Sequence, residues 1–254
     1  MKILRFSTAG SAKYGVLEER DRIREISGSI YEHFRFSGNT YNLGEVNLLA
    51  PCEPSKIVCV GLNYRAHIDE FKRDISGVPE EPVLFLKPST AVVGPEAGIV
   101  YPKRISRLDY EGELAVVIGK KARDINPDQA CGIILGYTCA NDVTARDLQK
   151  KDGQWTRAKS FDTFLPLGPW IETELDPGNL RIQLLLNNVV KQDSNTHNMI
   201  FPVPVLVSFI TGIMTLLPGD IILTGTPEGV GPMNVGDTVK VVVEGLGGLQ
   251  NHVL

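Results

Sequence analysis

The sequence predicts a β-rich α+β protein in which a mixed β-sheet is rolled into a sandwich or barrel, with a small N-terminal domain in front. Short apolar runs of strand length recur along the chain, and Gly or Pro turns separate many of them. Stretches with the length and pattern of helices are fewer, and they do not alternate regularly with the strands. This arrangement disfavours a doubly wound α/β sheet.

The first 50 residues alternate short strand-like pieces with turns such as Ser37-Gly38-Asn39 and carry no obvious catalytic set. Residues 48–54 contain two prolines and are typical of a linker. We therefore expect a small N-terminal domain over residues 1–50, packed against a larger domain over residues 51–254.

The larger domain is expected to begin with a strand over residues 56–61. Further strands are predicted from the apolar runs at residues 83–86, 114–118, 133–139, 182–186, 221–224 and 239–243. Helices are predicted at residues 64–72, 143–151 and 204–215, and Pro204 fits the first turn of the last one.

Composition excludes several classes of function. The net charge of −4 is spread over mixed signs, and we expect the short basic patch at residues 103–107 to be a solvated loop. We therefore expect neither nucleic-acid nor membrane binding. The N-terminus lacks the apolar core of a signal peptide, and no apolar run approaches the ~20 residues that span a bilayer, so we expect a cytoplasmic protein.

The four cysteines are Cys52, Cys59, Cys131 and Cys139. Their spacing does not fit a zinc site, and we expect buried free thiols.

Two carboxylates precede the strand predicted at residues 114–118. Glu111 and Glu113 are two residues apart, so on a strand they point to the same face. Burying two like charges costs several kcal/mol unless one takes a proton or a hard cation binds both. Taken alone, the pattern fits a solvated strand end as well as a divalent-metal site.

A third carboxylate follows another apolar run. Asp142 comes directly after residues 132–140 and can meet Glu111 and Glu113 across a sheet. Three carboxylates leave open positions on an octahedral ion such as Mg²⁺ for water or substrate oxygens. The alternative is that Asn141 or Asp142 is simply the N-cap of the following helix.

His67 and Glu70 form a second candidate pair. Asn63 can cap a short helix in which His67 and Glu70, three residues apart, share a face. Glu70 can then orient the imidazole and raise its basicity, as a general base requires. A solvated helix with an incidental polar pair is the other interpretation. The polar, turn-rich residues 72–82 are expected to form part of a lid.

Other candidates are weaker on their residues alone. Lys159 fits either a surface lysine or a cation that holds a substrate carboxylate or enolate. Arg146 and Gln149 share a helix face just after Asp142 and are candidate substrate contacts. Lys87 and Asp162 also fit structural charges, and His197 and His252 fit ordinary polar residues. The glycine-rich residues 225–231 lack the ending of a phosphate-binding loop, so a turn is the simple interpretation.

Six motifs in order resemble the fumarylacetoacetate hydrolase family over about four fifths of the chain, from about residue 50 to the C-terminus. They are Gly61-Leu62-Asn63-Tyr64-Arg65-Ala66-His67-Ile68-Asp69-Glu70, Phe85-Leu86-Lys87-Pro88, Asp109-Tyr110-Glu111-Gly112-Glu113, Asn141-Asp142-Val143-Thr144-Ala145-Arg146-Asp147, Lys159-Ser160-Phe161-Asp162 and Gly225-Thr226-Pro227-Glu228-Gly229-Val230-Gly231. Each motif alone is weak, but six in one order are specific. The resemblance implies the family's β-rich C-terminal catalytic fold and a homodimer.

The resemblance also implies an active site. Glu111, Glu113 and Asp142 would hold Mg²⁺ or Mn²⁺, His67 and Glu70 would activate water or shuttle protons, and Lys159 would act on the substrate. Thr226 would lie in the pocket with Arg146 and Gln149 nearby. The implied substrate is a small 2-oxo acid.

The implied reaction is hydrolysis of a C–C bond in an acylpyruvate-type diketo acid. Oxaloacetate decarboxylation and isomerisation of 2-hydroxyhepta-2,4-diene-1,7-dioate, as in aromatic catabolism, are close alternatives. A non-catalytic binding protein is a third possibility, and the presence of His67, Glu70 and Lys159 argues against it.

Overall fold

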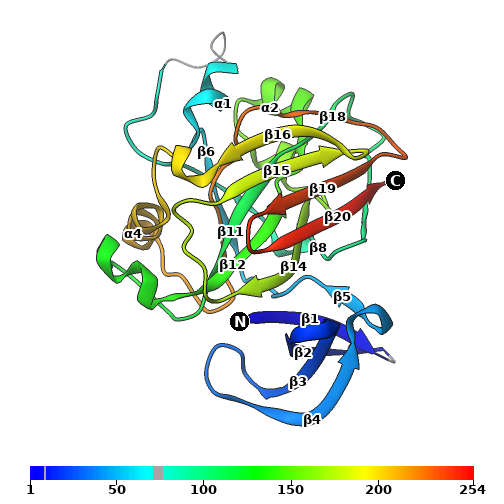
Figure 1. Ribbon diagram of the computed structural model, residues 1–254. Helices are drawn as coiled ribbons and strands as arrows, with labels where there is room; N and C mark the ends of the chain where they lie inside the picture. Colours follow the sequence, from blue (N-terminus) through cyan, green and yellow to red (C-terminus); the bar gives the residue numbers. More distant parts are fainter. Residues whose placement is uncertain (9, 71–76) are drawn as a thin grey trace.

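The computed structural model describes residues 1–8, 10–70 and 77–254 of the chain, which form three β-sheets and short helices (Figure 1). The largest sheet has 12 strands, and the other two have three and five. Residues 72–76 of the expected lid and residues 71–72 of the helix predicted at 64–72 lie outside the described residues.

The 12-stranded sheet runs in the order β4-β3-β2-β1-β14-β12-β11-β17-β6-β7, with β5 paired to β1 and β8 paired to β14. Its strands are β1 (Lys2–Thr8), β2 (Ser11–Leu17), β3 (Arg22–Gly28), β4 (Phe34–Asn42), β5 (Asn47–Leu49), β6 (Ile57–Gly61), β7 (Val83–Lys87), β8 (Val92–Val93), β11 (Gly112–Ile118), β12 (Ile134–Asn141), β14 (Leu165–Glu172) and β17 (Ile221–Leu223). Pairing is mixed, because β17 is parallel to β6 while β11 is antiparallel to both β12 and β17.

The five-stranded sheet runs β16-β15-β19-β20-β9, and the three-stranded sheet runs β13-β10-β18. Their strands are β9 (Gly98–Ile99), β10 (Leu108–Tyr110), β13 (Thr144–Ala145), β15 (Arg181–Leu186), β16 (Val189–Asn195), β18 (Gly231–Met233), β19 (Thr238–Val243) and β20 (Gly247–Val253).

The core explains why the predicted strands appear as unbroken apolar runs. Strand β11 is buried on both faces: Leu114 and Val116 pack in one apolar cluster, and Ala115 and Val117 pack in another. The first cluster also contains residues of β15 and β19, so the five-stranded sheet covers this face. Strands buried on both faces lose the apolar–polar alternation of half-exposed strands.

The β-rich α+β fold with sheets packed in a roll-like sandwich is therefore confirmed. The described strands leave the sheets open, so the barrel alternative is wrong.

Helices are short except for one. They are α1 (Arg65–Glu70), α2 (Arg146–Asp152), α3 (Thr156–Lys159) and α4 (Val203–Ile213). In α4, Pro204 lies in the first turn as predicted. The helix predicted to begin at residue 143 begins at Arg146 instead, because Thr144 and Ala145 pair with β10 in strand β13.

The N-terminal strands β1 to β5 lie together at one end of the molecule (Figure 1). Strand β1 joins them to the rest of the sheet by pairing Lys2 and Ile3 with Glu172 and Ile171 of β14. A small apolar cluster of Leu4, Phe6 and Ile23 lies within this N-terminal part. The division into residues 1–50 and 51–254 stays a prediction.

Among the described residues, no helix combines the length and the apolar character needed to cross a bilayer. The four cysteines are free thiols, and three are buried as expected. Cys131 is exposed, which corrects that prediction, because it lies on a short 3-10 helix, Pro127–Gly132, at the surface. The basic residues of the 103–107 patch are exposed, as expected.

Candidate active site

Three carboxylates converge in the interior. Ligand atoms of Glu111, Glu113 and Asp142 lie within 4.8 Å of one another, and each residue is at most 5% exposed. The solvated strand end considered for Glu111 and Glu113 is therefore wrong.

Antiparallel pairing brings these residues together. Strand β11 starts where β12 ends, so Gly112 lies opposite Asn141 and the Asp142 N–H donates to the Glu111 carbonyl at 2.8 Å. The Asn141 side chain accepts from the Glu111 N–H at 2.9 Å, which holds the backbone just before β11. Neither Asn141 nor Asp142 caps a helix, because α2 begins at Arg146 after Ala145 and shows no side-chain cap.

Buried cations neutralise two of the three carboxylates. The Lys159 ammonium donates to Glu111 at 2.7 Å and to Asp142 at 2.5 Å. Lys87 donates to the other oxygen of Asp142 at 2.5 Å, and Arg146 donates to the other oxygen of Glu111 at 2.5 Å. Arg146 also binds the buried Asp109 at 2.8 Å. Lys159 is 2% exposed and Lys87 is 1% exposed, so neither is a surface lysine.

Glu113 differs from its two neighbours. Among the described residues its hydrogen-bond donor is the backbone N–H of Gly225, at 2.7 Å, and it has no side-chain cation at bonding distance. Burial and the charges of Asp142 and Glu111 raise the pKa of Glu113 well above its usual range. For Glu111, burial acts in the same direction, but the charges of Lys159 and Arg146 outweigh it and lower the pKa.

The two lysines respond differently to the same surroundings. Burial lowers the pKa of Lys87, which binds one carboxylate. Burial also opposes the charge on Lys159, but Asp142 and Glu111 together raise the pKa of that ammonium. Lys159 is therefore held as a cation between two anions, while the ammonium of Lys87 is less strongly favoured.

A divalent cation fits this donor set. Among the buried groups of this network, the four carboxylates of Asp109, Glu111, Glu113 and Asp142 face three cations, Arg146, Lys87 and Lys159, so one carboxylate is in excess. The half-exposed Arg107 also binds Asp109, at 2.8 Å. Hard oxygen donors are the ligands that Mg²⁺ and Mn²⁺ prefer. A bound ion of charge +2 turns this excess into one positive charge, which a single carboxylate of a bound acid would neutralise.

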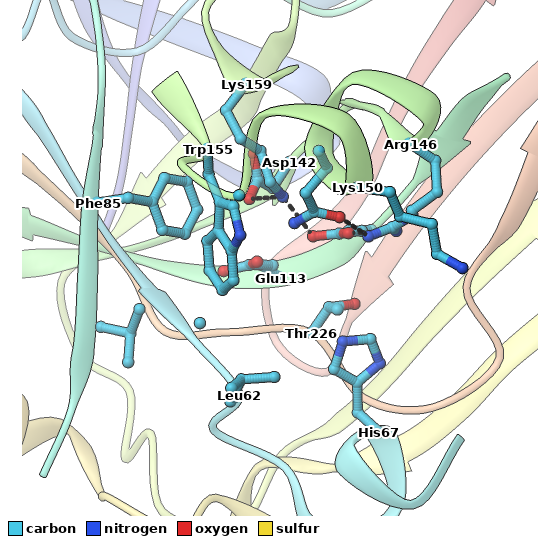
Figure 2. Close-up of a pocket in the computed structure, with 15 residues that line it drawn as sticks. Leu62, His67, Phe85, Glu113, Asp142, Arg146, Lys150, Trp155, Lys159 and Thr226 are labelled. Atoms are coloured by element: carbon cyan, nitrogen blue, oxygen red, sulfur yellow. Dashed lines mark hydrogen bonds and ion pairs between the residues drawn. The ribbon is translucent and has the colours of Figure 1, made fainter. Parts of the chain in front are cut away.

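The acidic group forms the floor of a cavity of about 410 Å³. Figure 2 shows two unlike walls: Phe85 and Trp155 lie on one side of Glu113, and Arg146, Lys150 and His67 lie on the other. The cavity joins a cluster of charges to a patch of apolar surface, which is typical of sites for small acids with a carbon tail.

His67 lines the cavity and is 7% exposed, while Glu70 behind it is exposed. The Nδ1 atom of His67 lies 3.6 Å from Glu70 Oε2, and the other oxygen of Glu70 accepts from the Gly229 N–H at 2.8 Å. Partial burial opposes the effect, but His67 and this N–H lower the pKa of Glu70, which favours an anion beside the imidazole. The solvated-helix interpretation therefore fails for His67.

The predicted cap of this helix is wrong. The Asn63 side chain donates to the carbonyls of Phe201 and Thr224 and accepts from the Phe201 N–H. Asn63 thus ties the segment before α1 to two distant loops, because its amide can satisfy several buried backbone groups at once.

Three predicted substrate contacts line the cavity: Arg146, Gln149 and Thr226. Arg146 donates to Gln149 at 2.6 Å, as expected for residues on one helix face. Thr226 donates its hydroxyl proton to the Gly112 carbonyl, so the hydroxyl is used for structure in this conformation. The roles of all nine predicted site residues stay predictions, and the structure brings their side chains to one place.

Sequence reasoning missed several residues at the site. By sequence Lys87 also fits a structural charge, although its position at the end of an apolar strand before Pro88 is a usable signal. Gln192 of β16, which is 1% exposed, accepts from the Gly112 N–H and donates to Thr226 and Pro227. No local pattern marked Gln192 or Trp155. Asp162, His197 and His252 have no part in the lining of the cavity, and Asp162 is exposed.

Comparison with protein families gives two matches that together span most of the chain. The family described as fumarylacetoacetate (FAA) hydrolase C-terminal matches residues 56–254. A family described as Rv2993c-like, N-terminal, matches residues 1–51. A curated relative, the mitochondrial oxaloacetate tautomerase Fahd2a of Rattus norvegicus, is 42% identical over 222 residues, which are 83% of this chain and 70% of the relative.

Solved structures show the same fold over the whole chain. The 2-hydroxyhepta-2,4-diene-1,7-dioate isomerase of Mycobacterium marinum is 45% identical, with a TM-score of 0.93 covering 100% of this chain and 98% of the other. The maleylpyruvate hydrolase of Sphingobium sp. SYK-6, in complex with manganese (II) and pyruvate, is 29% identical, with a TM-score of 0.82 covering 100% of this chain and 99% of the other.

Proposed function

The chain belongs to the fumarylacetoacetate hydrolase family, and we propose that it is a divalent-metal-dependent enzyme that hydrolyses a C–C bond of an acylpyruvate-type 2-oxo acid. Relatives in this family include a hydrolase, an isomerase and a tautomerase, so membership of the family indicates an enzyme, and the choice of reaction is our proposal.

The observation that carries the proposal is the buried Glu113 carboxyl, which has no cation at bonding distance among the described residues and lies beside Glu111 and Asp142 on the floor of a cavity that His67 also lines. Glu111, Glu113 and Asp142 would hold Mg²⁺ or Mn²⁺. The manganese and pyruvate bound to the maleylpyruvate hydrolase support an ion and a 2-oxo acid of this kind. When bound, such an ion supplies Lewis acidity toward oxygen atoms of the substrate.

The protein's own residues would do the rest. His67, oriented by Glu70, takes a proton from water as the water oxygen adds to the distal carbonyl carbon. The C–C bond to the pyruvyl carbon then breaks, and that carbon takes up a proton. The products are a carboxylic acid and pyruvate. Lys159 offers a permanent positive charge toward the electron pair that the pyruvyl part carries away.

Arg146 and Lys87 hold the carboxylates of the acidic floor in place. Arg146 links Glu111 to Asp109, and Lys87 binds the Asp142 oxygen that Lys159 leaves. Both contacts restrict the carboxylates to one orientation. Arg146 and Gln149 also border the cavity, where they can donate to a substrate carboxylate.

A second candidate is proton transfer without water, as in tautomerisation or isomerisation of a dicarboxylic 2-oxo acid. The rat oxaloacetate tautomerase and the mycobacterial isomerase favour this candidate. The two reactions in their names need only a base and an electron sink. Oxaloacetate decarboxylation needs the electron sink but no nucleophilic water.

A screen of acylpyruvates, oxaloacetate and hydroxydienoates with Mg²⁺ or Mn²⁺ and with EDTA tests the proposal. We expect acylpyruvate cleavage that EDTA abolishes. His67→Ala should lower cleavage by about 10²–10⁴-fold. His197→Ala, which alters an exposed histidine outside the cavity, is the matched control.

If His67→Ala loses acylpyruvate cleavage but keeps oxaloacetate decarboxylation, His67 acts as the base for water and the acidic group acts separately. Cleavage that persists in EDTA, or no turnover of any of these acids, would refute the proposal and favour a binding protein.

A further inference from the structure

The apolar wall of the cavity contains a tryptophan that the proposed chemistry does not use. Leu62, Phe85 and Trp155 form this wall next to the acidic floor (Figure 2). Trp155 is one of two tryptophans in the chain, and it is half-buried at the cavity rather than in the core.

Packing against a glycine fixes the indole. Gly61 is the last residue of β6, and a Cβ atom built there would lie 2.4 Å from Cζ3 and 2.7 Å from Cη2 of Trp155. Contacts of that length essentially never occur, so the ring rests where any larger residue would place its side chain. On neighbouring β7, the Phe85 ring meets the indole edge to face, with centroids 5.2 Å apart and planes at 74°.

The same short segment positions Trp155 and Lys159. Gly153 ends α2 in the left-handed conformation at φ 68°, and the Trp155 carbonyl accepts from the Lys159 N–H at 3.1 Å. The Lys159 ammonium lies 5.1 Å from the Phe85 ring centroid. The aromatic wall therefore begins beside the cation that faces the acidic floor.

Polarity decides which wall an apolar tail would face. The opposite wall offers Arg146, Gln149, Lys150 and His67, and covering such groups with carbon would desolvate them without a replacement hydrogen bond. A carbon chain that extends from a 2-oxo acid head group gains by packing on Leu62, Phe85 and Trp155 instead.

We propose that Trp155, held in place by Gly61 and Phe85, is a specificity-determining residue that limits the length of the apolar substituent on the 2-oxo acid. This inference rests on the proposed function only in taking the 2-oxo acid head group to lie at the acidic floor. The substrate class is then a 2-oxo acid with a short apolar tail, and the indole forms the end of the space that the tail can fill.

Binding of unreactive acids tests the inference without turnover. Pyruvate, 2-oxobutanoate, 2-oxopentanoate and 2-oxohexanoate form a series that lengthens by one methylene, and calorimetry gives their Kd values for the Mn²⁺-supplemented protein. In the wild type we expect affinity to fall once the tail reaches the indole. Trp155→Ala should move this limit to longer chains and change the ratio of Kd values for the longest and shortest acids by about tenfold or more.

Two further variants separate a specific effect from a general loss of structure. Trp170→Ala removes the other tryptophan, which packs against Gly247 and Lys2 away from the cavity, and should leave the length profile unchanged. Gly61→Ala should push the indole into the cavity and weaken binding of the longer acids about tenfold. In the Trp155→Ala background Gly61→Ala should have little effect, because the ring it would meet is absent.

A length profile that Trp155→Ala leaves unchanged would overturn the inference, as would equal effects of Gly61→Ala in both backgrounds. Circular dichroism of each variant checks that it folds. Acylpyruvate cleavage is measured separately. If cleavage is absent but the length limit shifts, hydrolysis fails and the inference stands. If none of the four acids binds, both fail.

Discussion

Two groups of charged side chains in this protein use similar residues under opposite conditions. At the acidic floor, Glu111, Glu113 and Asp142 are buried beneath the cavity. In the N-terminal strands, Glu25 of β3 accepts from Lys13 of β2 at 2.8 Å and from the Tyr41 hydroxyl of β4 at 2.7 Å. We call these residues the surface group, because their side chains are only partly buried.

The difference lies in how the charge is balanced. The surface group pairs one carboxylate with one ammonium, and its hydrogen bonds lower the pKa of Glu25 to about 2. The buried group has more carboxylates than ammonium groups, and burial with two like charges raises the pKa of Glu113. A folded protein keeps a buried imbalance only at a cost, so the imbalance, rather than the number of acidic residues, indicates a site for a cation.

Replacing Glu113 by Gln tests the buried side of this comparison and should have the largest effect. The amide keeps the shape but loses the charge that would bind the ion, so we expect kcat/KM with Mg²⁺ to fall by at least about 10²-fold. In EDTA the same variant should be more stable than the wild type by on the order of 1 kcal/mol, because the wild type must either bury an uncompensated charge at Glu113 or take up a proton there.

Steady-state kinetics and urea unfolding in EDTA measure these two opposite changes. Glu96→Gln, at an exposed carboxylate that contacts His252, is the control. Full Mg²⁺-dependent activity of Glu113→Gln, or a loss of its stability in EDTA, would contradict the assignment.

Lys87→Met sharpens the comparison from the cation side. Removing one partner of a buried pair leaves Asp142 with Lys159 alone and enlarges the negative excess, so we expect a loss of about 3 kcal/mol in the free energy of unfolding. Lys13→Met at the surface group is the matched control and should change stability far less. Equal losses in the two variants, measured by urea unfolding, would mean that burial does not separate the groups.

Gln192→Ala tests how far the buried group depends on the five-stranded sheet. The change leaves the Gly112 N–H without its acceptor and frees Thr226, so we expect a loss of about 1–3 kcal/mol together with lower activity. Gln183→Ala on the neighbouring strand removes a contact to Asp193 and should be nearly neutral. Denaturant unfolding and kcat/KM are measured for both variants. If Gln192→Ala changes neither stability nor kcat/KM, Gln192 does not support the site.

Glu25→Gln should have the smallest effect, and its pH dependence has a defined sign. The folded pKa of about 2 lies below the ordinary value of 4.5, so the stabilisation is complete above pH 4.5 and is lost as the pH falls toward about 2. The stability difference between wild type and variant should therefore shrink over that range, and salt should reduce it at neutral pH. Thermal melts at a series of pH values measure this difference. A stability difference that grows as the pH falls would contradict the prediction.

Local patterns in the sequence predicted the strands of the sandwich and the acidic group. The run at residues 114–118 is apolar throughout because β11 is buried on both faces, and the apolar run is visible in the sequence alone. Glu111, Glu113 and Asp142 could be found because each lies at a strand end, where an unexpected carboxylate stands out against apolar neighbours. The order of six motifs then indicated the family.

Predictions of helix caps and of one helix start were wrong where a residue could bond either to its neighbours in the chain or to a distant segment. Asn63 and Asn141 fit helix caps by sequence, yet their amides bind backbone groups near Phe201 and Glu111. The helix after Asp142 starts late because Thr144 and Ala145 pair with β10 instead. In each case a tertiary partner competed successfully with a local hydrogen bond.

The sequence by itself determined which side chains carry charge at the strand ends and which strands are buried, because both follow from neighbours in the chain. Only the tertiary structure decided that Lys87 binds Asp142, that Gln192 of the five-stranded sheet binds Gly112, and that Trp155 packs against Gly61. These partners come from separate strands and loops, and their contacts depend on sheet order and on the absence of a single Cβ atom, which spacing along the chain does not encode.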